Sequence, residues 1–590
     1  MADTPLSAPK QRYSNERNVQ ILVALLKARG IRRIVASPGT TNINFVWSVQ
    51  YDPFFQVISA VDERHAAYLA CGMAAESGEP VVITCTGATA SRNYFPGLTE
   101  AYYRKLPILA VTATQPRDRA GNLSPQMLDR TTPPRDTIRF AVYCQIPRTN
   151  EEEKDCELAV NKALIELKRH GGGPVHINLE TSYSGEFSVS ELPPARLISY
   201  TTPYDAIWPD LPQGGSIAIR IGAHRPFTEE ETALIEAFAV RHNAAVFVDH
   251  TSGYHGPSAV HGALAFSQPG RLGEDDLFAP LVIHLGEISG DYPGNMPMGR
   301  AQKVWRVNED GEARDLFRKL TAVFEMPEAP FFRHYAEPGT VGPSPFARRW
   351  QELVADLLAK APELPFSNPW IAQRLAPNLP KGSRLHLGIL NSLRSWNLFP
   401  LPEGVRSACN VGGFGIDGIV STALGASLAA PDRLVFVVVG DLAFFYDLNA
   451  IGNRQLGKNL RILLVNNAAG AEFHLSSHLA YRFGDYAKDF IAADGHFGNK
   501  SRELVRHYAT DLGLDYRAAD SKEAFDAVLP WFLGPSDKSL LLECFTDNGA
   551  ESEAHSRLSS IIPGRHRTLL ERAARKVARE TKQTLREFLK

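Results

Sequence analysis

Short runs of apolar residues recur along the chain, and stretches with helical periodicity separate them. In the first part of the sequence the apolar runs are Ile34–Ala36, Val57–Ala60, Val81–Thr84, Ile108–Val111 and Val175–Leu179. The helical patterns include Glu63–Ser77 and Cys156–His170. Because apolar residues fill each run instead of alternating with polar ones, both faces of each strand should be buried. The pattern predicts an α/β domain in which helices cover both faces of a parallel sheet.

The same pattern occurs twice more, as expected for 590 residues, which are too many for one core. The second set of runs is Ser216–Ile221, Ala245–Asp249, Leu281–Leu285 and Lys303–Val307. The third set consists of a helical pattern at Ser344–Lys360 and the runs Arg384–Gly388, Arg433–Val439, Leu460–Val465 and Ser539–Cys544. Leu192–Leu211 is predicted to be a linker, and Pro327–Pro345 is rich in proline and glycine. We predict three doubly wound parallel-sheet domains in series, at residues 1–190, 205–340 and 344–550.

The last segment, residues 551–590, is predicted to be a separate helical tail. Residues 565–590 contain nine basic and three acidic side chains, with apolar residues at roughly helical spacing. A basic amphipathic helix can contact a membrane or nucleic acid. The alternative is that it docks its apolar side on the protein itself or on a partner subunit, and we favour this alternative.

The overall charge is balanced, with 63 Lys and Arg against 65 Asp and Glu, so no global field favours nucleic acid or an anionic membrane. The six cysteines include no CxxC pair, which disfavours a zinc site or a disulfide framework. The N-terminus lacks the apolar core of a signal peptide, and no apolar run is long enough to span a bilayer. These features predict a cytoplasmic protein with a small-molecule substrate.

Oxygen-bearing side chains follow two apolar runs of the third set. The run Leu434–Val439 ends at Gly440 and Asp441, and the run Leu460–Val465 ends at Asn466 and Asn467. Ligands of parallel sheets bind beyond the carboxyl ends of the strands, and hard oxygen ligands suit Mg²⁺. Gly440 lets the backbone approach a ligand closely, and a helix predicted to open near Asp447 would offer N–H groups to an anion. Each motif alone is also a common turn or loop, but together they predict a magnesium site.

The two motifs resemble the cofactor motif of the thiamine diphosphate enzymes, a Gly-Asp pair followed along the chain by Asn-Asn. This resemblance implies thiamine diphosphate and Mg²⁺ as cofactors. It also implies that Asp441, Asn467 and the backbone carbonyl of Ala469 are the Mg²⁺ ligands. Most members have glycine where this chain has Ala469, but an alanine with negative φ should serve, since only its carbonyl is used.

The segment VDERHAAYLACGMAAESG, residues 61–78, places Glu63 at the start of a predicted helix. The resemblance implies that this carboxyl group acts on the cofactor's aminopyrimidine ring, which makes Glu63 the first catalytic candidate. The alternative is an ordinary acidic residue at a helix N-terminus. In the segment NVGGFGIDGIVSTALGA, residues 410–426, the resemblance implies that Ile416 bends the cofactor and that Gly415 belongs to its backbone wall. It further implies a homodimer or tetramer whose active sites take Glu63 from one chain and the metal from another.

Within the family, the chain resembles the menaquinone-pathway synthases, which add succinic semialdehyde derived from 2-oxoglutarate to isochorismate. The matching segments include ASPGTTN (36–42), NYFPGLTEAYYRKLPILAVTAT (93–114), GILNSLRSW (388–396) and VGDLAFFYDLNAI (439–451). The cofactor-binding positions that this resemblance implies are Asn93, Asn391, Ser392, Gly440, Leu442 and Ala443.

The basic residues with which those synthases bind their carboxylate-rich substrates are replaced in this chain. The four substitutions at predicted substrate positions are Thr41, Gln115, Trp396 and Val411, and a Lys-Arg pair aligns less securely with Asp291 and Tyr292. An unpaired buried carboxylate costs several kcal/mol. We therefore expect an uncharged or hydroxyl-rich acceptor.

New polar groups occur near the predicted site, namely Arg92, Glu472 and His474. Glu472 or His474 is a candidate general acid or base, with His65 as a weaker candidate. The alternative is that they are exposed loop residues. The main hypothesis is an enzyme that decarboxylates a small 2-oxo acid and transfers the acyl anion to an aldehyde or ketone. The alternatives are the menaquinone-pathway synthase itself and a cofactor-binding homologue without catalysis. The sequence does not identify the donor or the acceptor.

Overall fold

The structure is a computed structural model, and it describes residues 11–127, 132–268, 277–295, 297–336, 342–495 and 501–562. Internal contacts divide the chain into two compact units. The first unit comprises residues 1–208 and 309–325, and the second comprises residues 209–308 and 326–590. The three predicted domain ranges stay predictions, because this division does not test them. Within the described ranges, no helix has both the length and the apolar character needed to cross a membrane.

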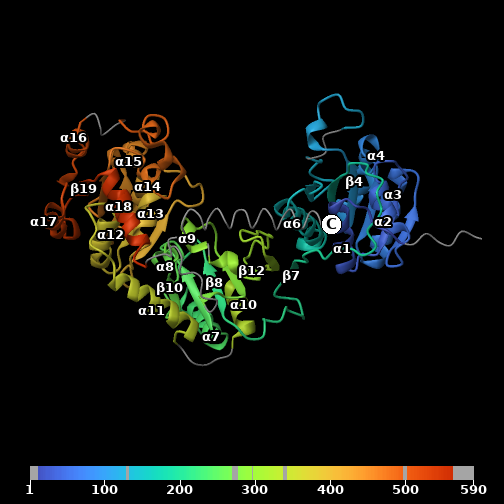
Figure 1. Cartoon of the computed structure of the whole chain (residues 1–590), viewed down its shortest axis with the longest axis horizontal. Helices are drawn as coiled ribbons and strands as arrows, with labels where there is room; N and C mark the ends of the chain where they lie inside the picture. Colours follow the sequence, from blue (N-terminus) through green and yellow to red (C-terminus); the bar gives the residue numbers. More distant parts are fainter. Residues whose placement is uncertain are drawn as a thin grey trace, which may run out of the picture. The chain divides into compact units, whose positions relative to one another are not determined.

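The first unit is built on a six-stranded parallel sheet with the order β2-β1-β3-β4-β6-β5. Figure 1 draws these strands in blue to teal. Its strands are β1 (Arg33–Ala36), β2 (Gln56–Ser59), β3 (Val81–Cys85), β4 (Ile108–Thr114), β5 (Phe140–Cys144) and β6 (Val175–Glu180). One face is covered by α1 (Arg17–Ala28), α2 (Ile43–Gln50) and α6 (Asn150–Glu166). The other face is covered by α3 (Glu63–Ser77), α4 (Ala88–Asn93) and α5 (Phe95–Arg104). Consecutive strand residues supply opposite cores, as Ile34 and Val35 do.

Four shorter elements complete the first unit. They are η1 (Arg117–Arg119), η2 (Arg169–Gly171), β7 (Ser199–Thr201) and β13 (Leu320–Phe324). The last two pair in parallel with each other.

The second unit contains strands of two further parallel sheets. The middle set runs in the order β10-β9-β8-β11-β12, and the last sheet in the order β15-β14-β16-β17-β19-β18. The middle strands are β8 (Ile217–Ile221), β9 (Ala244–Val248), β10 (Ala259–His261), β11 (Leu281–Leu285) and β12 (Lys303–Val307). The last six are β14 (Arg384–Leu387), β15 (Arg406–Cys409), β16 (Val435–Gly440), β17 (Leu460–Asn466), β18 (Asp515–Ala519) and β19 (Leu540–Phe545). The predicted fold class, α/β with three parallel sheets flanked by helices, is confirmed.

The helices of the second unit follow the same alternation with strands. Those of the middle part are α7 (Glu229–Arg241), α8 (Ala263–Phe266), α9 (Tyr292–Asn295), η4 (Met298–Arg300), α10 (Glu328–Tyr335) and α11 (Pro345–Ala359). Those of the last part are α12 (Asn368–Leu375), η5 (Ala376–Asn378), α13 (Asn391–Trp396), α14 (Ile419–Ala429), α15 (Asp441–Tyr446), η6 (Leu448–Gly452), η7 (Ala471–His474), η8 (Leu479–Ala487), α16 (Leu504–Asp511), α17 (Lys522–Leu533) and α18 (Asn548–Ser559). Helices α14, α15 and α16 pack on one face of the last sheet, against Val437 and Ile462.

Local signals explain where the helices begin. Helix α3 starts after Asp62, whose carboxylate accepts the His65 N–H, and it ends at Gly78, which adopts the left-handed conformation at φ 68°. Helix α6 starts after Thr149, which forms a capping box with Glu152. The predicted start of this helix at Cys156 was therefore wrong, because the capping box opens it earlier.

Several strands that the sequence did not predict lie at sheet edges. Strands β5, β10, β15 and β18 are edge strands, and most of their residues are only partly buried. Edge strands need no continuous apolar run, so the criterion that found the central strands misses them. The predicted linker Leu192–Leu211 likewise contains β7.

Two further expectations need correction. The helix after β16 opens at Asp441 itself, whereas Asp447 stands at its end and accepts hydrogen bonds from Ser421 at the start of α14. The predicted boundary between residues 550 and 551 falls inside α18. The basic part of the predicted tail lies outside the described residues from residue 563 onwards.

Candidate active site

The carboxyl ends of β16 and β17 are adjacent, and both predicted metal-binding side chains stand there. The two strands pair in parallel, with Gly440 opposite Val465. Asp441 follows the first strand and Asn467 the second, and they are 5% and 8% exposed. Two separate segments therefore bring a carboxylate and an amide oxygen to one edge of the sheet.

The Asp441 carboxylate accepts hydrogen bonds from backbone N–H groups and not from a basic side chain of the described residues. The N–H of Leu442 donates to it at 2.8 Å, and the N–H of Ala468 also hydrogen-bonds to it. It forms no ion pair with any residue in the described part of the chain. Burial raises the pKa of Asp441 to about 7. A buried carboxylate in this state would be stabilised by a bound cation.

The loop after β17 has the backbone conformation that the metal hypothesis needs. The positive φ of this loop, 69°, occurs at Ala468, and Ala469 is not among the residues with positive φ. Ala469 therefore meets the condition under which its carbonyl can replace that of a glycine. The Ala469 N–H lies 3.4 Å from Oδ1 of Asn467, and the Asn467 carbonyl accepts a hydrogen bond from Asn548 at 3.2 Å.

In the first unit, Glu63 is the first residue of α3 and is half-buried. Within the described residues its carboxylate accepts a hydrogen bond from the Asn93 side chain at 3.4 Å. The structure thus brings together two residues that were predicted to bind or activate the same cofactor. Arg92 precedes Asn93 in the last turn of α4 and is exposed. His65 is also exposed.

Similarity to known proteins covers nearly the whole chain. A sequence model of the family described as "Thiamine pyrophosphate enzyme, N-terminal TPP binding domain" matches residues 17–132. Over 563 residues the chain is 30% identical to the 2-succinyl-5-enolpyruvyl-6-hydroxy-3-cyclohexene-1-carboxylate synthase of Bacteroides fragilis, covering 92% of this chain and 98% of that protein.

The chain belongs to the thiamine diphosphate-dependent enzymes.

Other relatives give the same result. The synthase of the same name from Bacteroides thetaiotaomicron is 30% identical over 563 residues, covering 92% of this chain and 98% of that protein. The Desulfotalea psychrophila synthase is 28% identical over 536 residues, covering 88% and 96%. A solved structure, the Rhodococcus jostii RHA1 thiamine diphosphate-dependent 4-hydroxybenzoylformate decarboxylase, is 16% identical, with a TM-score of 0.40 and coverage of 90% and 99%. That likeness is too distant to add to the assignment.

The residues around Asp441 fit the Mg²⁺ ion of a thiamine diphosphate-dependent enzyme. The predicted donor set consists of one carboxylate, one amide oxygen and one carbonyl oxygen, all of them hard ligands. The described residues contain no group of three or more His, Cys, Asp or Glu suited to a metal, so no competing cluster of that kind exists there. The observation that supports the fit is the buried carboxylate of Asp441, which accepts hydrogen bonds from backbone N–H groups and has no basic partner among the described residues.

The predicted diphosphate residues stand at the start of α13, which follows β14. Oδ1 of Asn391 lies 3.1 Å from Nε2 of His555, and Oγ of Ser392 accepts a hydrogen bond from Asn368 at 3.4 Å. Ile416 is half-buried and packs beside the core that contains Phe444, whereas Gly415 is exposed. The neighbouring positions Gly440, Leu442 and Ala443 form the junction of β16 and α15.

The predicted substrate residues differ in how much surface they offer. Trp396 is fully buried, and its indole N–H donates to Asn368 at 3.2 Å; Val411 is also buried. Trp396 therefore presents no surface to a substrate here, which goes against its predicted role. In the first unit Thr41 bonds to Thr86, and Gln115 bonds to both Tyr183 and Arg119.

Glu472 and His474 both have partners. Glu472 forms an ion pair with Arg394 of α13 at 2.6 Å, and its second oxygen has no hydrogen-bond partner among the described residues. His474 lies 3.3 Å from Asp494. Both side chains are less than one-quarter exposed, at 16% and 19%, so they are not the freely exposed loop residues of the alternative interpretation. Asp291 is buried beside Arg220, and the side chain of Tyr292 lies outside the described residues.

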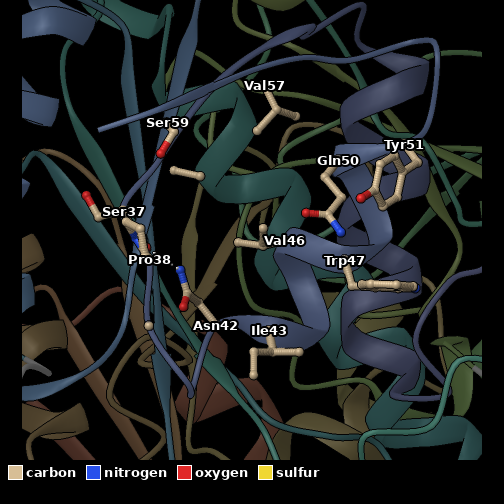
Figure 2. A pocket seen from close by; sticks show the side chains of 12 residues that line it. Ser37, Pro38, Asn42, Ile43, Val46, Trp47, Gln50, Tyr51, Val57 and Ser59 are labelled. Carbon is tan, nitrogen blue, oxygen red and sulfur yellow. Dashed lines mark hydrogen bonds between the residues drawn. The ribbon is translucent and has the colours of Figure 1, made fainter. Parts of the chain in front are cut away.

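A pocket of about 490 Å³ lies in the first unit between α2 and the ends of β1 and β2. Figure 2 shows Ser37 and Asn42 on one side of this pocket and Trp47 and Tyr51 on the other. All twelve lining residues are uncharged. Helix α2 covers the sheet face opposite to the one covered by α3, and Glu63 does not line the pocket.

Sequence interpretation missed the contribution of α18 and of Asn368. Side chains of α18 contact Asn467, at the end of the cofactor motif, and Asn391, at the start of α13. The available signal was the recurrence of polar residues at positions 548, 551, 552 and 555, which share one face of a helix. Dividing the sequence after residue 550 separated these residues from the domain to which they belong.

Proposed function

We propose that this thiamine diphosphate-dependent enzyme decarboxylates a 2-oxo acid and joins the resulting acyl group to an acceptor through a new C–C bond. The observation that carries the proposal is the buried Asp441 carboxylate beside the Asn467 loop, because this oxygen set has no other evident use. When bound, the cofactor supplies a carbon nucleophile and an electron sink. Asp441, Asn467 and the Ala469 carbonyl would hold Mg²⁺, and the Glu63 carboxyl would hold a proton at the aminopyrimidine ring.

The first candidate reaction is that of the menaquinone-pathway synthases, with 2-oxoglutarate as donor and isochorismate as acceptor. It is supported by 30% identity over 98% of the Bacteroides fragilis synthase. Arg119, which bonds to Gln115, and the exposed Arg92 are cations that could bind carboxylates from positions other than those of the relatives.

The second candidate reaction uses an uncharged, hydroxyl-bearing aldehyde or ketone as acceptor. It is supported by the uncharged residues at positions 41, 115 and 411. Arg394 of α13 is already paired with Glu472.

A donor and acceptor screen tests both candidates. Purified enzyme is supplied with thiamine diphosphate and Mg²⁺, and carbon dioxide release and product mass are measured for 2-oxoglutarate and pyruvate. The acceptors are isochorismate and a set of neutral aldehydes and hydroxyketones, and Glu63→Gln serves as the inactive control. Efficient turnover of isochorismate supports the first candidate and overturns the second. A ligated product with neutral acceptors alone does the reverse. Cofactor binding without carbon dioxide release from any donor overturns the proposed function.

We also propose a cytoplasmic homo-oligomer in which Glu63 of one copy completes the site of another copy. The support is the family resemblance, together with the location of Glu63 and Asp441 in different units. Mixing refolded Glu63→Gln and Asp441→Ala subunits tests this. Random dimers with shared sites should regain about a quarter of wild-type activity, since half are mixed and each mixed dimer has one intact site. No recovery despite verified subunit exchange would contradict the shared site.

A further inference from the structure

One face of α18 is bonded to four segments around the candidate metal and diphosphate site. Helix α18 begins after Asp547, whose carboxylate caps the N–H groups of Gly549 and Ala550. Asn548, Ser552 and His555 follow at intervals of four and three residues, so they lie above one another on the helix. Helices α12, α13 and α18 belong to the same unit and pack together (Figure 1).

The N-terminal end of this face contacts the metal loop. The Asn548 amide donates to the Asn467 carbonyl at 3.2 Å. One helical turn further, Oγ of Ser552 accepts the Ser476 N–H at 3.2 Å. These two bonds connect α18 to the segments directly after β17, on both sides of η7.

The C-terminal end of the face contacts α13. Nε2 of His555 lies 3.1 Å from Oδ1 of Asn391 and 3.2 Å from Oγ of Ser395. Burial lowers the pKa of His555 to about 4, so the ring is neutral at physiological pH. An amide oxygen can only accept, and Nε2 must therefore carry the ring proton and donate it. The bond fixes both the tautomer of His555 and the orientation of the Asn391 amide.

A buried carboxylate links the same face to α12. Glu551 is fully buried, and its Oε1 accepts the Asn368 N–H at 2.9 Å and the Thr546 hydroxyl at 2.8 Å. The Asn368 side chain in turn contacts Ser392 and Trp396 of α13. The Asn391 side chain also hydrogen-bonds to Glu551. Helix α13 is thus held by both His555 and Glu551.

We propose that α18 is a positioning element for the cofactor, with Asn548 fixing the metal loop and His555 fixing the first turn of α13. Neither residue needs to touch the cofactor. Each holds a residue that the family resemblance assigns to it, Asn467 for the metal and Asn391 for the diphosphate side. This inference rests on the proposed function. Partners behind the ligands of a metal site commonly contribute tenfold to a hundredfold to affinity.

The test compares four single variants by calorimetric titration of thiamine diphosphate at fixed Mg²⁺. His555→Leu and Asn548→Ala should weaken cofactor binding by about tenfold to a hundredfold. His555→Gln keeps an N–H donor and should recover most of the affinity. Glu553→Gln is the matched control, since Glu553 lies on the exposed side of α18 and pairs with Arg557. At saturating cofactor, kcat should return close to the wild-type value, as expected for a loss of positioning in the binding step.

The outcomes separate this inference from the proposed function. If the wild-type enzyme does not bind thiamine diphosphate, the proposed function fails. If the wild-type enzyme binds it and His555→Leu and Asn548→Ala bind it equally well, the positioning role of α18 is overturned. Should His555→Leu fail to unfold cooperatively, Asn548→Ala and His555→Gln decide the matter. If His555→Gln loses as much cofactor affinity as Asn548→Ala does, the role of His555 as a hydrogen-bond donor is contradicted.

Discussion

The carboxyl ends of the first and the last sheet carry the two groups of candidate catalytic residues, and they differ in how firmly these residues are held. At the first sheet, Glu63 is half-buried and its hydrogen bond to Asn93 is long, at 3.4 Å. At the last sheet, Asp441 is 5% exposed and bonded to two backbone N–H groups. The side chains behind it, on α12 and α18, are bonded in turn.

This contrast matches the chemistry that each region is proposed to perform. Oxygen ligands of a small cation must converge before the ion arrives, since Mg²⁺ tolerates little distortion of its ligand geometry. A rigid, buried framework provides that convergence. An acid that acts on a cofactor ring must instead be reachable by that cofactor, which in the proposed homo-oligomer is held by another copy of the chain. The Glu63 side chain must therefore stay accessible, whereas the oxygen ligands around Asp441 must be fixed in place.

The largest expected effect comes from Asp441→Ala. It removes the carboxylate among the proposed Mg²⁺ ligands, so Mg²⁺-dependent binding of thiamine diphosphate should fall by more than about a hundredfold. The protein without cofactor should lose no stability, because the buried carboxylate is itself unfavourable there. Calorimetric titration and thermal unfolding measure the two effects, with the exposed Asp432→Ala as control. Retention of tight binding would remove the basis for calling the last sheet the metal-binding region.

Glu63→Gln should act on proton transfer and leave binding almost unchanged. Loss of a positioned acid or base typically costs a factor of about 10²–10⁴. Exchange of the thiazolium proton with solvent deuterium, followed by NMR after acid quenching, should slow by this factor. The cofactor dissociation constant should stay within a few-fold of wild type. Glu76→Gln, an exposed position in the same helix, is the control. Unchanged exchange would show that the first sheet holds a different acid.

Much of the fold could be predicted from the sequence, because central strands need continuous apolar runs. The predicted and observed bounds agree at Leu281–Leu285 and Lys303–Val307. Those of β16 differ by one or two residues at each end, and β17 starts as predicted and ends one residue later. The edge strand β15 escaped prediction because its exposed side needs no apolar residues. Helix α6 began earlier than its apolar pattern suggested, because Thr149 and Glu152 cap it.

The candidate site could be predicted only where a motif marked it. Asp441 and Asn467 follow strands, so their convergence follows from the rules of parallel sheets. His555 and Asn368 follow no such rule, because their role depends on which helices pack together. Trp396 was predicted to face the substrate from its place in a motif, yet it lies in the core, since the helix turns it towards Asn368.

Buried carboxyl groups in the two units should also change the stability of the protein in opposite directions as pH rises. Burial raises the pKa of Glu551 from 4.5 to about 7, so ionisation of this group costs stability as pH rises through that range. Burial also opposes ionisation of Asp52 in the first unit, but bonds from Lys27, Phe54 and Tyr13 outweigh it and lower the pKa. Ionised Asp52 thus stabilises above about pH 4, and this stabilisation is lost as pH falls further.

The expected result is that stability of the cofactor-free protein declines between pH 5 and pH 8, and that Glu551→Gln removes about 1–3 kcal/mol of this decline. Asp52→Asn should leave the decline in stability between pH 5 and pH 8 unchanged. It should reduce the loss of stability that wild type shows below pH 4. Urea unfolding across this pH range measures both. If the stability of Glu551→Gln declines with pH as steeply as that of wild type, the Glu551 carboxyl group does not cause the decline.

Asn93→Ala should give the smallest effect and thereby the sharpest test of the contrast. Asn93 is exposed and donates one long hydrogen bond to Glu63, so its loss should change the free energy of unfolding by less than about 0.5 kcal/mol. Proton exchange should slow only a few-fold, because the Glu63 backbone remains fixed at the start of α3 by the Asp62 cap. A loss of stability above about 1 kcal/mol, or a slowing of exchange comparable to that of Glu63→Gln, would mean that Asn93 holds Glu63 as firmly as the backbone holds Asp441. The first sheet would then be as preorganised as the last, and its exposure would need another explanation.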